Sequence, residues 1–134
     1  MRAAKGKLCG GIVSRMEIPM KASDLVKKHC KPCEKGTPPL SSGQVSEMLK
    51  GLPGWETTGK EIAKTFKFNN YHETMAFVNA TAWVSHREDH HPDLEVGYNK
   101  CKLRYSTHSV GGLSENDFIC AAKVNELLDG PRLA

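Results

Sequence analysis

The stretch LEVGYNKCKLRYSTH, residues 94–108, decides the fold because its apolar and polar side chains alternate with a period of two. One face would carry Cys101, Leu103, Tyr105 and Thr107, and the other Lys100, Lys102, Arg104 and Ser106. This alternation predicts a half-buried antiparallel strand. A tight turn near Asn99 would pair the strand with residues 94–98.

Helices and a hairpin are predicted on both sides of this strand pair. The expected elements are a helix capped by Ser41 or Ser42, a hairpin over 55–68 around Gly59, and helices over 69–89 and 114–130. Strands that are apolar on one face need a layer of helices over that face. The sequence therefore predicts an α+β fold, with three helices packed on one face of a four-stranded antiparallel sheet.

The helix predicted over 69–89 is expected to bury an apolar stripe. Its members are Tyr71, Met75, Val78 and Ala82, widened by Phe77 and Trp83. Pro92 disfavours helical geometry at His91, so the helix should end before it. His90 and His91 would then lie just past the C-terminal end of the helix.

The charge of the chain is divided unevenly along its length. Nine of the 19 Lys and Arg but only three of the 15 Asp and Glu lie in residues 1–35. We interpret residues 1–39 as a flexible basic arm that could include the remnant of a targeting peptide, and residues 40–134 as one folded domain. The domain itself is slightly acidic, which argues against direct nucleic-acid binding.

The cysteine content and the hydropathy of the chain indicate the cellular compartment in which the protein is expected. Five cysteines at irregular spacing, without a secretory signal, favour a reducing environment. No apolar run approaches the roughly 20 residues that span a bilayer, so no membrane association is expected. We predict a cytoplasmic protein, or one of a mitochondrion or plastid if residues 1–20 are a transit remnant.

Clustered histidines are the candidate reactive groups, and three explanations compete. His86, His90, His91 and His108 could simply be polar residues at solvated ends of elements. His86 and His90, with Asp89 or Asp93, could bind zinc on spacing alone, but the helix should fray before His90 and the sequence has no His-Glu-x-x-His pattern. Cys30 and Cys33 form one isolated pair, and a structural zinc site would need a second pair near it. The third explanation is general acid–base catalysis, because imidazole both accepts and donates protons near neutral pH.

The run DHHPDLEVGYNKCKLRYSTHSVGGLSENDF, residues 89–118, resembles the signature of pterin-4a-carbinolamine dehydratases. The resemblance covers about residues 40–128 and includes Gly54 and Trp55 upstream. It implies the same α+β fold, assembly into a homodimer or homotetramer, and no metal or cofactor. The implied reaction removes water from 4a-hydroxytetrahydropterin and yields quinonoid dihydropterin, which recycles the pterin of aromatic amino-acid hydroxylases.

The resemblance also implies a role for individual residues. The catalytic set is His90, His91, His108 and Asp117: His90 and His108 would exchange protons, and His91 would chiefly hold the substrate. The residues expected to contact the pterin are Asp89, His90, His91, Ser106, Thr107, His108 and Ser109. Asp117 would orient an imidazole, although position N3 of a capping box begun by Ser114 explains an acid there equally well.

An alternative function is a protein-binding or assembly module. Some members of the resembled family also act as dimerisation partners of a transcription factor. Such a role would use exposed faces of the sheet or the helices and would not need the histidines.

Overall fold

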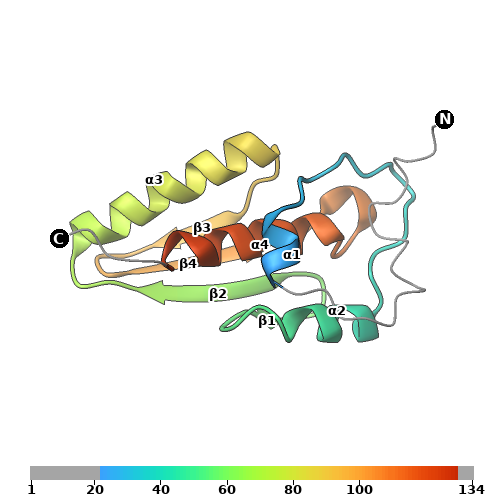
Figure 1. Ribbon diagram of the computed structural model, residues 1–134, viewed down its shortest axis with the longest axis horizontal. Helices are drawn as coiled ribbons and strands as arrows, with labels where there is room; N and C mark the ends of the chain where they lie inside the picture. Colours follow the sequence, from blue (N-terminus) through green and yellow to red (C-terminus); the bar gives the residue numbers. More distant parts are fainter. Residues whose placement is uncertain (1–21, 130–134) are drawn as a thin grey trace.

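The computed structural model describes residues 22–129, which form a four-stranded antiparallel sheet and surrounding helices (Figure 1). The elements in chain order are α1 (Ala22–Val26), α2 (Ser42–Leu49), β1 (Glu56–Thr57), β2 (Ile62–Lys67), α3 (Tyr71–Glu88), β3 (Asp93–Val96), β4 (Lys100–Tyr105), the 3₁₀ turn η3 (His108–Val110) and α4 (Glu115–Leu127). The sheet order is β1-β2-β4-β3. The predicted α+β class is confirmed, and α1 is an additional short helix.

The strand β4 lies at the centre of the core, as the alternation predicts. Its residues Cys101, Leu103 and Tyr105 are completely buried. They face α4, whose Phe118 and Ile119 are also buried, while the intervening Lys102 and Arg104 are only partly covered. The register pairs β4 with β2 on one side and with β3 on the other. Burial of one face of each strand against helices is therefore the main source of stability.

The buried face of helix α3 only partly matches the stripe that the sequence predicts. Tyr71 and Trp83, assigned to the apolar stripe, are 49% and 60% exposed. Phe77 of the predicted stripe is buried and Val78 packs against the core, but the other buried residues of the helix are Thr74, Thr81, Ser85 and Glu88. The hydroxyl groups of the two buried threonines and of Ser85 can be buried because they bond to backbone carbonyls, as Ser85 does to Thr81 O at 3.0 Å. Hydrophobicity alone therefore predicts only part of the buried face of this helix.

Residues 22–39 were assigned to the arm by composition, and the structure places them against the domain. Leu25 in α1 is completely buried and belongs to the main core. At the other end of the segment, Leu40 N–H donates to Leu113 O at 2.9 Å. The composition does not reveal this packing because the segment is mostly polar. The possible targeting remnant lies outside the described residues.

Within residues 22–129, none of the helices is both long enough and apolar enough to cross a membrane.

Candidate active site

A short hydrogen bond joins the residue just past the end of α3 to the first turn of α4. The His90 Nε2 atom lies 2.6 Å from Asp117 Oδ1. The Asp117 side chain is fully buried, and that of His90 is 12% exposed. A buried carboxylate bonded to an imidazole fixes the orientation of the ring.

The second oxygen of Asp117 holds the neighbouring loop. Asp117 Oδ2 accepts hydrogen bonds from Thr107 Oγ1 at 2.8 Å and from Ser114 N–H at 3.0 Å. Ser114 begins α4 as its N-cap, and Asp117 completes the predicted capping box. One carboxylate therefore completes the capping box and also contacts the His90 ring.

The turn after α3 brings His90 to this position. Asp89 ends the helix in the left-handed conformation, with φ 52° and ψ 44°, and is the one described residue other than glycine with positive φ. The His90 N–H then donates to Ser85 O at 3.2 Å. Left-handed backbone is costly for most residues, but aspartate tolerates it better than most.

The His90 ring also stacks on Tyr105 of β4. The ring centroids are 5.9 Å apart and the planes are inclined by 8°. Tyr105 is completely buried, and burial raises the pKa of its phenol above the ordinary value. Its hydroxyl has no hydrogen bond of standard geometry among the described residues, although the Ser85 hydroxyl is near enough to influence the pKa. The aromatic ring and Asp117 thus constrain the imidazole from two directions.

A pocket of about 210 Å³ opens beside His90. This is smaller than the roughly 300–1,000 Å³ of sites for drug-sized ligands, and it suits a compact ligand. The residues that line it are Cys30, Lys31, Pro32, Cys33, Glu88, Asp89, His90, Thr107, Ser109 and Asn116. The pocket therefore combines the end of α3, the loop after β4, the start of α4 and the arm.

Four of the predicted site residues line this pocket together: Asp89, His90, Thr107 and Ser109. Asp117 lies behind them, bonded to both His90 and Thr107. His91 and His108 are exposed, and Ser106 is half-buried; none of the three lines the pocket. His108 nevertheless stands between two lining residues, Thr107 and Ser109.

Sequence reasoning missed the part of the wall formed by Cys30–Cys33, Glu88 and Asn116. The Cys30 Sγ atom lies 3.6 Å from the Sγ atom of Cys120 in α4, and both cysteines are free. Contact with Cys120, followed by burial, raises the pKa of the Cys30 thiol. The one signal in the sequence was the cysteine pair itself, which does not reveal its distant partners.

The zinc explanation finds no support in residues 22–129, where His, Cys, Asp and Glu nowhere form a group of three able to hold a metal ion. The chemistry that the pocket offers is proton exchange, through an imidazole held by a buried carboxylate.

Similar proteins are known from several bacteria. The family profile "Pterin 4 alpha carbinolamine dehydratase" matches residues 38–127. A Nitrosospira multiformis protein named "Putative pterin-4-alpha-carbinolamine dehydratase" is 62% identical over 104 residues, 78% of this chain and 92% of that protein. A Nitrosomonas eutropha protein of the same name is 60% identical over 106 residues, 78% of this chain and 94% of that protein.

A solved structure is similar as well. The "transcriptional coactivator/pterin dehydratase" of Brucella melitensis has a TM-score of 0.65 and 29% sequence identity to this chain, covering 68% of this chain and 99% of that one.

Proposed function

Because this chain belongs to the pterin 4 alpha carbinolamine dehydratase family, we propose that it removes water from a 4a-hydroxytetrahydropterin to give the quinonoid dihydropterin. The observation that carries the proposal is the His90–Asp117 pair at the wall of a small pocket. Reduction of this product in a separate step would regenerate the tetrahydropterin of aromatic amino-acid hydroxylases.

The reaction requires two proton transfers. An imidazolium protonates the 4a-hydroxyl, and the C4a–O bond breaks with its electron pair leaving in water. A neutral imidazole accepts the N5 proton, and the electrons of the N–H bond form the N5=C4a double bond. No electron acceptor, metal or covalent intermediate is needed.

We assign these roles to His90 and His108, with His91 holding the ring. Because His90 Nε2 is engaged by Asp117, its Nδ1 atom is the one that would exchange a proton with the substrate. Asp89, Ser106, Thr107 and Ser109 are the proposed pterin contacts, and four of the proposed residues lie together in the pocket wall. His108 is included on the resemblance, and it lies exposed between the lining residues Thr107 and Ser109.

The test is the decay of the enzymatically generated carbinolamine, followed by absorbance. The purified chain should accelerate this decay, and His90→Ala and His108→Ala should each reduce the acceleration by roughly 10²-fold or more. His72→Ala is the matched control, because His72 is exposed at the start of α3. A wild-type rate equal to the spontaneous rate would disprove the proposal.

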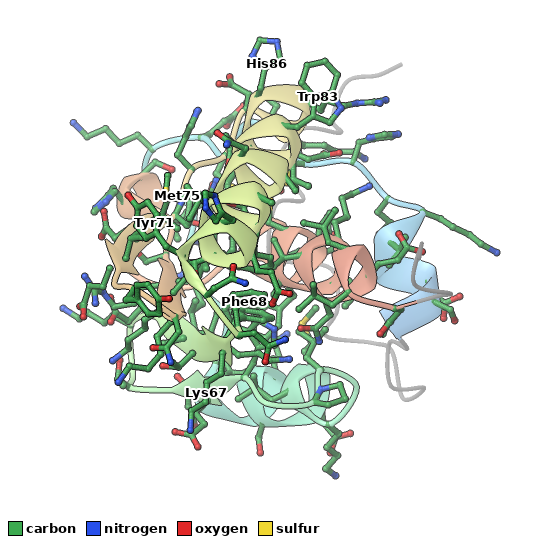
Figure 2. The ribbon with its side chains drawn as sticks, turned by 90° about the vertical axis from the view of Figure 1, so that its left-hand side faces the viewer. Lys67, Phe68, Tyr71, Met75, Trp83 and His86 are labelled. Atoms are coloured by element: carbon green, nitrogen blue, oxygen red, sulfur yellow. The ribbon has the colours of Figure 1, made fainter. Side chains whose placement is uncertain are left out.

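The second candidate function is binding of a protein partner. It is favoured by the word coactivator in the name of the Brucella structure and by exposed aromatic residues on α3. Figure 2 shows Trp83 and His86 projecting from the end of this helix, where their ring centroids are 5.6 Å apart. A partner that remains bound to the His90→Ala variant but not to Trp83→Ala would support this function.

We further propose a homodimer or homotetramer, using the same exposed surfaces. Light scattering coupled to size-exclusion chromatography would measure its mass, and a monomer at all concentrations would contradict it.

A further inference from the structure

Residues 28–33, here called the strap, connect α1 to the rest of the arm and lie across two helix ends. Figure 1 shows this part of the chain passing the C-terminal end of α3 and the N-terminal end of α4. The segment is held at both ends, by buried Leu25 before it and by Leu40 after it. Its position is therefore defined by the domain and not only by its own sequence.

The buried carboxylate of Glu88 fixes the strap to α3. Glu88 Oε1 accepts the Cys30 N–H at 2.8 Å, and Oε2 lies 3.1 Å from His29 Nδ1 and 3.4 Å from Lys123 Nζ. The Glu88 side chain is only 4% exposed. Burying a charge is costly unless it is paired, so these contacts stabilise a single arrangement of strap and helix end.

Asn116 and Glu115 fix the strap to the first turn of α4. Asn116 exchanges two hydrogen bonds with the Lys31 backbone, at 3.1 Å to its N–H and 2.7 Å to its carbonyl. Lys28 Nζ lies 2.6 Å from Glu115 Oε2. The residue that follows these two is Asp117, so one helical turn positions both the strap and His90.

We propose that the strap is a wall of the pterin-binding site, and that Lys31, Pro32 and the two cysteines contact the bound ring from the side opposite His90. All four line the pocket that His90, Asp89 and Thr107 line from the domain. They lie outside residues 38–127, the part that matches the family profile. This inference rests on the proposed function for the identity of the ligand.

The wall contributes to ligand affinity and not to the proton transfers. The Lys31 ammonium is a hydrogen-bond donor toward the oxygen and nitrogen atoms at the edge of a pterin. Replacing its side chain leaves the backbone bonds to Asn116 and the His90–Asp117 pair in place. Weaker binding with an unchanged turnover number is therefore the expected signature.

The experiment measures the Kd of 7,8-dihydrobiopterin, a stable reduced pterin, by fluorescence titration of full-length protein. Lys31→Ala should weaken binding by roughly fivefold or more, and KM for the carbinolamine should rise in parallel while kcat is retained. Lys35→Ala is the matched control, because Lys35 is an exposed lysine just past the strap and does not line the pocket. Its Kd should equal that of the wild type.

A second measurement does not depend on a substitution. Amide hydrogen exchange of Cys30, Lys31 and Cys33 should slow when 7,8-dihydrobiopterin is added, because a wall in contact with ligand opens less often. Wild-type binding with equal Kd values for the two lysine variants and unchanged exchange in the strap would overturn the inference and leave the proposed function standing. A wild type that neither binds the pterin nor accelerates dehydration would overturn both.

Discussion

His90 and Asp117 are 27 residues apart in the chain, yet their side chains meet at 2.6 Å. The contact links the left-handed end of α3 to the capping box of α4. The geometry of the imidazole therefore depends on both helix ends at once.

Replacing Asp117 by asparagine should separate catalysis from folding. An amide retains an oxygen acceptor for Ser114 N–H but no longer provides a negative charge beside the imidazole. We expect the free energy of unfolding to fall by about 1 kcal/mol and the dehydration rate to fall by roughly 10²-fold or more. Stopped-flow absorbance and urea denaturation measure the two effects. Glu126→Gln, an exposed change on the same helix, is the control, and equal rates in the two variants would contradict the role of Asp117.

The contribution of the Glu88 carboxylate to the stability of the fold should disappear at acidic pH. Burial alone would raise the pKa of Glu88, but the Cys30 N–H, His29 and Lys123 together lower it below its ordinary value. Because the pKa is lower in the folded state, the stabilisation is complete above the unfolded pKa of about 4.3 and is lost as pH falls through the lower folded value.

Glu88→Gln should therefore reduce the free energy of unfolding by about 1–3 kcal/mol at pH 7, and this difference should shrink below about pH 4. Thermal denaturation of both proteins from pH 3 to pH 7 measures the difference. Glu47→Gln, which alters an exposed ion pair with Lys50, should have little effect at any pH. If the difference in stability between the wild type and Glu88→Gln stays constant with pH, the charge of Glu88 is not its source.

Substitutions of Asp89 should change stability in opposite directions. Glycine adopts the observed φ of 52° without steric cost, so Asp89→Gly should raise the free energy of unfolding by roughly 0.5–1 kcal/mol. Asp89→Ala should lower it by about 1 kcal/mol, because alanine is strained in this region. Chemical denaturation distinguishes the two. Both variants should bind 7,8-dihydrobiopterin more weakly if the carboxylate contacts the pterin, so the glycine variant would be more stable and bind less well.

Tyr105 should be replaceable by phenylalanine but not by a small residue. Its hydroxyl is buried without a standard hydrogen bond among the described residues, so Tyr105→Phe should change stability by less than about 1 kcal/mol. Tyr105→Ala removes a fully buried ring in contact with Trp55 and His90 and should cost about 3–5 kcal/mol. Melting temperatures provide the comparison, and a large loss in the phenylalanine variant would reveal a hydrogen bond to the hydroxyl.

Local patterns in the sequence predict the sheet and the start of α4. The period of two over residues 100–105 assigns β4 and its buried face, because a strand offers only two faces. Ser114 and Asp117 define a helix start through chemistry confined to four residues. Such features need no knowledge of distant residues.

The buried face of α3 and the strap could not be predicted in this way. Helix α3 buries Thr74, Thr81 and Ser85, and their hydroxyl groups can lie in the core because they donate hydrogen bonds to backbone carbonyls. The strap is fixed by bonds from Cys30 and Lys31 to residues 58 and 85 positions away. Neither kind of partner is visible in a local pattern. Of the candidate site, Asp89, His90, Thr107 and Ser109 line one pocket while His91, Ser106 and His108 do not, and the wall formed by the arm was not foreseen.

The first turn of α4 has a consequence for how the protein opens. Glu115, Asn116 and Asp117 hold the strap, the loop after β4 and His90 together, so fraying of that single turn would release all of them as one cooperative unit. A ligand in the pocket would oppose this fraying, and its binding energy would appear as added resistance of the turn to proteolysis. The rate at which a protease cleaves this turn would then report ligand occupancy, without any measurement of the reaction.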